Sequence, residues 1–434
     1  MLGKNLTYFI LMKEKLNFLI KINKLKETPR TGWVLRNVKN PETIAEHIFR
    51  VAIASWILSA KRGLNVKRAI KVALSHDLCE VYAGDVTPFF YYINLPKDKK
   101  KRKEVLKKWV RLSKKEKEKR GKKKFEKEKK GLLRLIKNLK PKLRRDIFSN
   151  WFDYEKGVSK EGRFVKQVDK IETLIQAVEY FGSGKDTPVV GWWEEIEEIT
   201  EDALLLDFLK IIQKKFYRKK IKISKENQDL ENILEFLLDI GKLKKMPRMY
   251  WVIREVKNPE TVAGHIFTLV LMAWVFGSEK EKKYNIEKLL KMALCHEISA
   301  VYTGDTTPYD DILPKDKKKR RKLLERWTRL SKKEKTKKFI KDYQNEKKAL
   351  EKLTNKLDRG FKKEIIQLWD EYRTRSTPEG YFLSQLNVLA VLLQALSYEE
   401  KKSFLAAPIW EWAFEKCDDK ICFQFFDEIK RKFY

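Results

Sequence analysis

LKETPRTGWVLRNVKNPETIAEHIF (Leu25–Phe49) returns in the same chain as LKKMPRMYWVIREVKNPETVAGHIF (Leu243–Phe267), 218 residues later. A second phrase repeats at the same offset, since PKDKKKRKEVLKKWVRLSKKEK from Pro96 is matched by PKDKKKRRKLLERWTRLSKKEK from Pro314. Self-similarity at one fixed spacing is the signature of a duplicated structural unit. The repeat extends over nearly the whole chain of 434 residues, which is also longer than an ordinary single domain.

Both copies are expected to be helical throughout. In AEHIFRVAIASWILSA and FVKQVDKIETLIQAVEYF the apolar residues recur every three or four positions, and the alternation typical of β-strands is hardly seen. Pro41 and Pro259, each followed by Glu-Thr, are expected to start helices. The sequence therefore predicts an all-α protein with two tandem domains, 1–219 and 220–434, joined near the polar stretch Arg218–Gln228.

The composition excludes several classes of protein. A hydrophobic content of 43% with 24 Phe and 12 Trp is too apolar for a disordered chain. The four cysteines form no CxxC pair, which favours a reducing compartment, and we expect the protein to be cytoplasmic. The N-terminal sequence MLGKNLTYFILMKEKLNFLIKINKLK is expected to form an amphipathic helix and not a signal peptide. No uninterrupted apolar stretch approaches the ~18–20 residues of a membrane span, so no membrane association is expected.

The net charge of +36 is concentrated in two segments. Residues 97–130 contain 20 Lys or Arg against 6 Asp or Glu, and residues 315–348 contain 17 against 5. Clustered lysines with Trp109 and Phe125 between them could bind nucleic acid. Val105, Leu106, Trp109, Val110 and Leu112, however, recur at helical spacing, which favours a hairpin docked on the domain with solvated lysines. Nucleic-acid binding is the less favoured alternative, and a positive field that attracts anionic nucleotides is expected either way.

The chain has only four histidines, His47, His76, His265 and His296, and they occupy equivalent positions in the two copies. A single histidine on an apolar helix is usually a core residue, but this matched pattern indicates a use for imidazole. Asp77 follows His76 directly, and Asp169 lies on the apolar side of a later helix, where a carboxylate is costly unless it is paired or bound to metal. Two imidazoles and two carboxylates suit a divalent transition metal such as Mn, Co, Fe, Ni or Zn.

His47, His76-Asp77 and Asp169 resemble the H…HD…D signature of the HD-domain metal-dependent phosphohydrolases. The wider phrases PRTGWVLRNVKNPETIAEH, ALSHDLCEVYAGDVTP and FVKQVDKIETLIQAVEY are similar to one branch, the bacterial 5′-deoxynucleotidases and their eukaryotic HD-domain-containing homologues.

The resemblance implies a role for each matching residue. His47, His76, Asp77 and Asp169 would hold one ion, with Glu80 and Asp85 as the catalytic acids. Arg30 would contact the substrate phosphate, and Trp33 would pack on the sugar. A carboxylate one helical turn from the ligand pair can relay a proton of a water bound to the ion, although Glu80 could instead be a local cap or a lysine partner.

The second copy departs from this pattern at the positions on which the chemistry depends. His265 and His296 remain, while Asp77 corresponds to Glu297, Glu80 to Ala300, Asp169 to Asn387 and Glu46 to Gly264. Asparagine is a neutral, weaker ligand, and alanine cannot move a proton. Arg248, Trp251 and Asp305 are retained. The second site is therefore predicted to be catalytically degenerate.

These observations predict a phosphohydrolase that removes the 5′-phosphate of (deoxy)nucleoside monophosphates at the N-terminal site. An HD phosphodiesterase acting on cyclic, signalling or oligonucleotide substrates and a nucleic-acid-binding protein remain alternatives. Because single-domain relatives of this kind are typically dimeric, the tandem chain is expected to form an intra-chain pseudo-dimer, with the second domain structural or ligand-sensing.

Overall fold

The computed structural model describes residues 2–87, 95–107, 113–182, 187–217, 228–307, 310–325, 330–401 and 406–433. Within these ranges every regular element is a helix, and β-structure is limited to isolated bridges that join Pro29 to Thr43 and Pro247 to Thr261. The all-α prediction is therefore confirmed.

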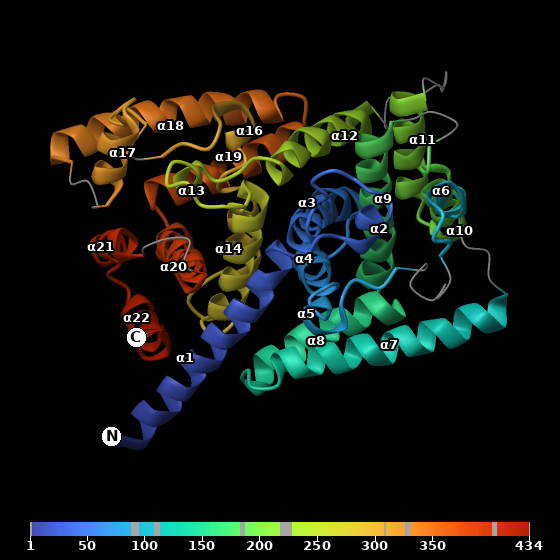
Figure 1. The fold of residues 1–434 in the computed structure, drawn as a ribbon, viewed down its shortest axis with the longest axis horizontal. Helices are drawn as coiled ribbons and strands as arrows, with labels where there is room; N and C mark the ends of the chain where they lie inside the picture. Colours follow the sequence, from blue (N-terminus) through green and yellow to red (C-terminus); the bar gives the residue numbers. More distant parts are fainter. Residues whose placement is uncertain are drawn as a thin grey trace. The chain divides into compact units, whose positions relative to one another are not determined.

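The chain forms two compact units, Lys21–Leu237 and Met1–Ile20 with Leu238–Tyr434 (Figure 1). The helices of residues 21–237 are α2 (Thr31–Leu35), α3 (Ile44–Arg62), α4 (Val66–Ser75), α5 (Glu80–Ala83), α6 (Lys99–Lys107), α7 (Lys114–Ile136), α8 (Pro141–Lys156), α9 (Lys160–Phe181), α10 (Val190–Ile199), α11 (Ala203–Tyr217) and most of α12 (Gln228–Gly241). A 3₁₀ turn, η1 (Lys24–Lys26), precedes α2. Helix α3 is buried along nearly all its length and packs on α4 and α9.

The other unit repeats this order. Its helices are most of α1 (Leu2–Asn23), then α13 (Met249–Val252), α14 (Val262–Gly277), α15 (Ile286–Cys295), α16 (Ala300–Thr303), α17 (Lys317–Leu324), α18 (Lys332–Thr354), α19 (Arg359–Thr374), α20 (Pro378–Glu400), α21 (Ala407–Lys416) and α22 (Lys420–Phe433), with η4 (Lys242–Lys244) before α13. Here α14 packs on α15 and α20, as α3 packs on α4 and α9.

Helix α3 begins and ends where its local sequence dictates. The Thr43 side chain accepts from the backbone N–H of Glu46, and the Glu46 carboxylate accepts from the N–H of Thr43, which is a complete capping box. The helix ends at Gly63, in a left-handed conformation that glycine adopts without strain. Pro41 therefore lies two residues before the cap and not in the first turn. In α14 the cap Thr261 is kept, but Gly264 supplies no carboxylate for the reciprocal bond.

The two compact units exchange the first helices of the repeats. Residues 1–20 belong with residues 238–434, and residues 228–237 belong with residues 21–217. Lys15 on α1 forms an ion pair with Glu279 at 2.5 Å, and on α12 Asp229 pairs with Lys61 and Glu231 with Lys214. The compact units thus differ from the contiguous ranges 1–219 and 220–434, which remain a sequence prediction.

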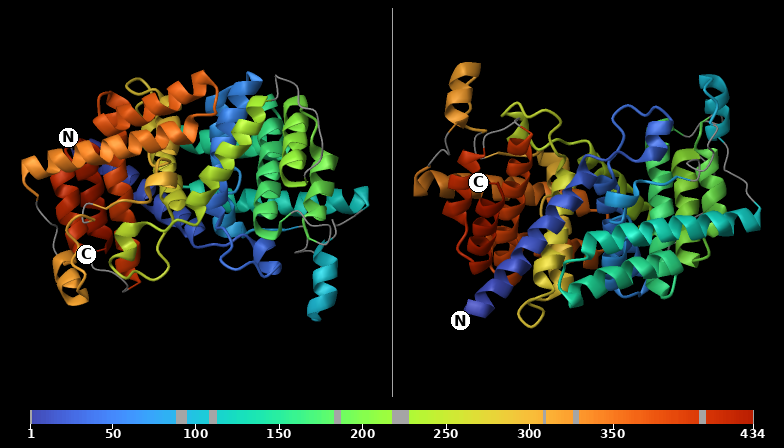
Figure 2. Two further views of the ribbon diagram at one scale, coloured as in Figure 1. Left: turned by 90° about the horizontal axis from the view of Figure 1, so that it is seen from above. Right: turned by 60° about the horizontal axis from the view of Figure 1, so that its bottom comes forward.

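The lysine-rich helix α7 is docked by its aromatic side chain. Phe125 stacks on Trp151 of α8 with ring centroids 5.4 Å apart, and the two helices lie side by side (Figures 1 and 2). On α6, Leu106 is buried and Val105 is exposed. Trp109, Val110 and Leu112 lie outside the described residues. Phe125 therefore packs α7 on α8, as the docked-hairpin interpretation expects.

Within the described residues, one helix has the length and apolar composition of a membrane-crossing helix, α20. Of its most apolar 18-residue window, 83% is buried inside the structure. This is the property of a core helix, which needs the same apolar composition to pack on all sides.

The helix exchange predicts that a chain cut between the repeats stays together. Leu16 and Leu19 of α1 and Leu230 and Leu234 of α12 are fully buried in their units, and each is worth about 1.5–3 kcal/mol of burial. A protease site inserted within residues 218–227 should therefore give two fragments that co-elute in native size-exclusion chromatography and separate only in denaturant. Fragments that separate as two folded monomers under native conditions would contradict the exchange.

Candidate metal centre

Four side chains from three helices and one turn meet in the unit of residues 21–237. His47 lies on α3, His76 caps the C-terminus of α4, Asp77 follows in the turn to α5, and Asp169 lies on α9. His47 Nε2 is 2.9 Å from Asp169 Oδ1 and 3.3 Å from His76 Nε2, and His76 Nε2 is 3.2 Å from Asp77 Oδ2. His76 and Asp77 lie at the C-terminal end of α4, where adjacent side chains can turn towards one point.

The hydrogen bonds of the two imidazoles leave their Nε2 lone pairs directed into the cluster. His47 Nδ1 donates to Glu172 at 2.6 Å, and His76 Nδ1 donates to the carbonyl of Ala73 at 2.6 Å. Asp169 Oδ1 is buried and lies 2.9 Å from His47 Nε2, while its Oδ2 accepts from the Tyr154 hydroxyl at 2.6 Å. Electron pairs at such distances repel each other unless a positive charge lies among them. Ligands about 2.1 Å from one ion would be about 3.0–3.4 Å apart, so the residues fit a divalent metal.

The electrostatics of the cluster also favour a cation. Burial would raise the pKa of Asp77, but His76 and Arg30 hold it well below its usual range. Burial would likewise raise the pKa of Asp169, which Lys170 and His47 instead lower. Both carboxylates are thus held ionised, the state in which a carboxylate binds metal.

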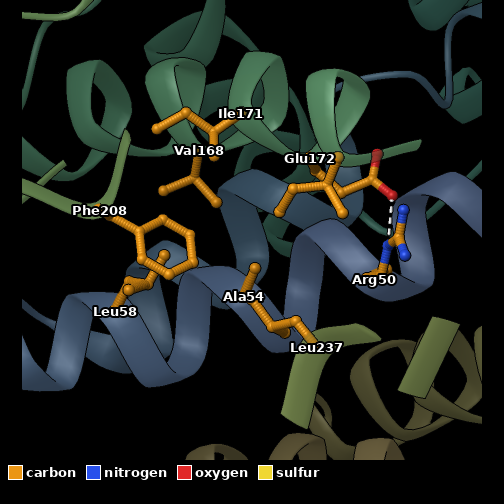
Figure 3. A pocket seen from close by; sticks show the side chains of 9 residues that line it. Arg50, Ala54, Leu58, Val168, Ile171, Glu172, Phe208 and Leu237 are labelled. Atoms are coloured by element: carbon orange, nitrogen blue, oxygen red, sulfur yellow. Dashed lines mark hydrogen bonds and ion pairs between the residues drawn. The ribbon is translucent and has the colours of Figure 1, made fainter. Parts of the chain in front are cut away.

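A buried network orients His47, and the sequence analysis missed it. Glu172, one turn after Asp169 on α9, accepts from His47 with one oxygen and from Arg50 Nε with the other, at 2.7 Å. Arg50 is fully buried and also donates to Gln176 and Glu179. Figure 3 shows Arg50 reaching Glu172 beside a small apolar cavity. Carboxylates that accept from a ligand histidine fix its tautomer and raise its basicity.

Glu80 is placed as a proton-handling group requires. It begins α5 one turn after Asp77, is buried, and its Oε2 has no hydrogen-bond partner. Burial and the nearby Asp77 and Asp85 raise the pKa of Glu80 well above its usual value. A close approach of α7 covers this turn, since a Cβ on Gly131 would lie 2.8 Å from the carbonyl oxygen of Cys79.

Arg30 and Asp85 form the edge of the site. Arg30 Nη1 donates to Asp77 Oδ2 at 3.1 Å, with its side chain only 14% exposed. Asp85 Oδ2 accepts from the backbone N–H of Thr31 at 2.5 Å, and the Thr31 hydroxyl donates to the Asp85 carbonyl. Asp85 therefore fixes the segment that carries Arg30.

Trp33 is buried beside the segment that carries Arg30, and its contact with a sugar stays a prediction. It is 1% exposed, its indole N–H donates to Glu42 at 2.8 Å, and its ring packs on Trp192 and Tyr180. Since the N–H of Arg30 donates to the carbonyl of Glu42, Trp33 and Glu42 together anchor the Arg30 segment to the start of α3.

Two lysines near the cluster were also missed. Lys170 Nζ lies 3.5 Å from Asp169 Oδ2, and Lys124 of the lysine-rich helix pairs with Glu128 at 3.3 Å. The pKa of Lys124 is raised because Glu128, Glu155, Asp77 and Glu80 outweigh the effect of its burial. Charge runs on a helix are usually solvated, so nothing in the sequence distinguished Lys124 from its neighbours.

The second copy assembles the corresponding residues with different bonding. The rings of His265 and His296 are 5.5 Å apart, against 5.4 Å for His47 and His76. Asn387 donates through Nδ2 to Tyr372, so that its Oδ1 faces His265 Nε2 at 2.8 Å. Arg248 pairs with Glu297 and with Asp305, as Arg30 pairs with Asp77 in the first copy.

The tautomer of His265 is therefore reversed relative to His47. The repeat offset of 218 aligns Glu172 with Ala390 and Arg50 with Thr268, and Glu260 lies 3.9 Å from Nδ1 of His265, beyond hydrogen-bonding distance. Its Nε2 carries the proton and donates to Asn387, so its metal-binding lone pair is lost. Burial and the neighbouring Arg248 lower the pKa of His265 to about 4. The second site keeps His296 and Glu297 as possible ligands but has one carboxylate where the first site has two.

A family model described as HD domain matches residues 22–204 and again residues 240–409. The chain belongs to the HD domain family. It is similar to 5′-deoxynucleotidase HDDC2 of Danio rerio, with 33% identity over 171 residues that make up 39% of this chain and 72% of the relative. The homologue of the same name from Homo sapiens is 35% identical, with 39% and 69% covered, and that from Dictyostelium discoideum is 30% identical, with 47% and 92% covered.

Both repeats are HD domains, so the tandem organisation predicted from the repeat is confirmed. HD domains are metal-dependent, and groups that could hold an ion occur in each, His47, His76 and Asp77 in the first and His265, His296 and Glu297 in the second. In the first HD domain Glu172 lies 2.6 Å from Nδ1 of His47 and holds its proton away from the cluster, whereas Glu260 is 3.9 Å from Nδ1 of His265 in the second.

Glu172→Ala, which copies Ala390 of the second HD domain, should lower metal affinity by about 10- to 100-fold, because His47 loses the acceptor that keeps its Nε2 deprotonated. Titration of the metal-free protein with Mn or Co by calorimetry would measure this. Glu179→Ala is the matched control, since it removes another carboxylate partner of Arg50 that does not touch His47. Equal losses in the two variants would show that Arg50, and not the His47 tautomer, is what matters.

Proposed function

We propose that the first HD domain is a metal-dependent phosphohydrolase that removes the 5′-phosphate of nucleoside monophosphates, with deoxynucleotides as the preferred class. The observation that carries the proposal is the convergence of His47, His76, Asp77 and Asp169 beside the buried, unpartnered carboxylate of Glu80. The names of the relatives, 5′-deoxynucleotidases, support the choice of substrate.

His47, His76, Asp77 and Asp169 would hold one divalent transition metal. Such an ion supplies Lewis acidity and lowers the pKa of a water bound to it. Glu80, whose own pKa is raised, is matched to accept a proton from the attacking water and to return it to the leaving 5′-oxygen.

The phosphate dianion is met by cations from three directions. Arg30 reaches the site from the segment before α2, Lys170 lies beside Asp169 on α9, and Lys124 points in from α7. Fixed positive groups stabilise the charge on a transferring phosphoryl group most when they are already oriented before the reaction. Asp85 acts as a positioning residue for Arg30 through its bonds to Thr31.

The second HD domain does not hydrolyse phosphate esters. Ala300 stands where Glu80 is needed, Asn387 replaces Asp169, and Asp342 and Val388 stand at the positions of Lys124 and Lys170. We propose that its fold contributes an intra-chain counterpart of the dimer partner, in a cytoplasmic protein.

Phosphate release from a panel of 5′-(deoxy)nucleoside monophosphates, measured in the presence of Mn or Co, tests the proposal. Glu80→Gln should lower kcat by about 10²- to 10⁴-fold with little change in KM, because it removes proton transfer and keeps the side-chain volume. Glu297→Gln in the second HD domain is the matched control and should leave kcat unchanged. Turnover of cyclic or oligonucleotide substrates in preference to monophosphates would refute the substrate assignment.

A further inference from the structure

The degenerate HD domain carries an open cavity of about 710 Å³ directly over its altered site. It extends from His296 and Glu297 to side chains of α18, α19 and α21. A smaller cavity of about 110 Å³ adjoins it and shares Thr306, Asn387 and Trp412 as lining residues. The loss of catalytic groups has therefore not been accompanied by closure of the site.

Cations gather at the outer edge of the large cavity. Lys335 of α18 and Lys416 at the end of α21 share a single carboxylate, Glu415, at 2.6 and 3.8 Å. Arg375, directly after α19, also lines the cavity, and its guanidinium forms no ion pair or hydrogen bond among the described residues. Burial lowers the pKa of Lys416, and the nearby Lys335 and Arg375 lower it further. The other acids that line the cavity have cations of their own, since Asp342 pairs with Lys338 and Glu346 with Arg373, while Lys335, Lys416 and Arg375 face the single carboxylate of Glu415.

Arg375 and its counterpart in the first repeat share a left-handed conformation, which is strained for arginine and unstrained for glycine. The φ of 54° for Arg375 lies in the left-handed region, at the C-cap of α19. The first repeat has Gly157 at this position, with φ 60° at the C-cap of α8. A left-handed arginine costs stability that glycine does not, and such strain points to a use for the side chain.

The change of charge at the C-terminal end of α19 involves three residues. Glu155, Lys156 and Gly157 of the first repeat, with no net charge, become Arg373, Thr374 and Arg375, with a charge of +2. Arg373 pairs with Glu346 at 2.8 Å, which leaves Arg375 as the cation free to meet a ligand. While the second copy lost the counterparts of Lys124 and Lys170 near its histidines, it gained arginines at the cavity edge.

A buried hydrogen-bond acceptor and an aromatic lining also favour a bound ligand in the cavity. His296 is 1% exposed and lines the cavity, and its Nε2 has no hydrogen-bond partner while Nδ1 donates to the Ala293 carbonyl. This buried acceptor suits a hydroxyl or amino group of a bound molecule. The adjoining small cavity is lined by Tyr250, Trp251, Val391 and Trp412, which suit a flat apolar ring.

We propose that the second HD domain binds a nucleoside monophosphate without metal and without hydrolysing it. The phosphate lies against Lys335, Arg375 and Lys416, a sugar hydroxyl donates to His296, and the base enters the cavity beside Tyr250 and Trp412. This binding is independent of hydrolysis in the first HD domain, so either proposal can fail alone.

The test uses the full chain carrying Asp77→Ala, treated with EDTA, so that the first site neither holds metal nor consumes the probe. Equilibrium dialysis with adenosine 5′-monophosphate should show saturable binding of one molecule per chain. Adding Arg375→Gly should weaken binding at least about tenfold while the melting temperature stays the same or rises, because glycine relieves the left-handed strain. A misfolded variant would show the opposite change in melting temperature.

Lys363→Ala is the matched control, since it removes an exposed positive charge from α19 outside the cavity. It should leave binding unchanged. Absence of saturable binding, or binding that Arg375→Gly and Lys416→Ala leave intact, would overturn the proposal. Inorganic phosphate should bind at least about tenfold more weakly than the nucleotide, and equal affinity would overturn the nucleotide assignment.

Discussion

Two imidazole nitrogens and two carboxylates lie within hydrogen-bonding distance of one another in the first HD domain. Such a cluster is repulsive by itself and stable only around a positive charge. The surrounding structure maintains it: Arg50 and Glu172 hold the proton of His47 on the far side of the ring, and the Ala73 carbonyl does so for His76. Glu80 can serve in proton transfer because the residues that would hold the metal ion lie one helical turn away from it.

The second repeat shows what remains when that constraint is released. Its two histidines keep nearly the same ring separation, while Asn387 replaces the carboxylate of Asp169 and Glu297 replaces Asp77. The fold survives this change because the histidines pack as core residues and Asn387 satisfies His265 with a neutral hydrogen bond. A helical scaffold that no longer has to hold a metal is free to acquire other charges, which is what the arginines after α19 show.

Much of this could be predicted from the sequence because the signals are rare or periodic. A chain with four histidines in two matched pairs marks its own ligands, and the long repeat with helical spacing fixes the fold class. Glu172 and Arg50 were missed because acids and bases are abundant here, at 61 and 97 residues. A signal did exist. Each lies three residues after a ligand, on the same helical face, and both are lost together in the second repeat as Ala390 and Thr268.

Other features could not be predicted from the sequence. The exchange of the first helices uses the same amphipathic surfaces whichever unit receives them, so local sequence does not distinguish the two arrangements. Trp33 sits beside the site in the sequence, but only the fold shows that Glu42 and Trp192 hold it in the interior.

The metal content of purified protein tests the central claim most directly, with Asp77→Ala and Glu297→Ala analysed beside the unaltered chain. One ion per chain, lost in Asp77→Ala and kept in Glu297→Ala, is expected, whereas two ions per chain, or one that depends on Glu297, would contradict it.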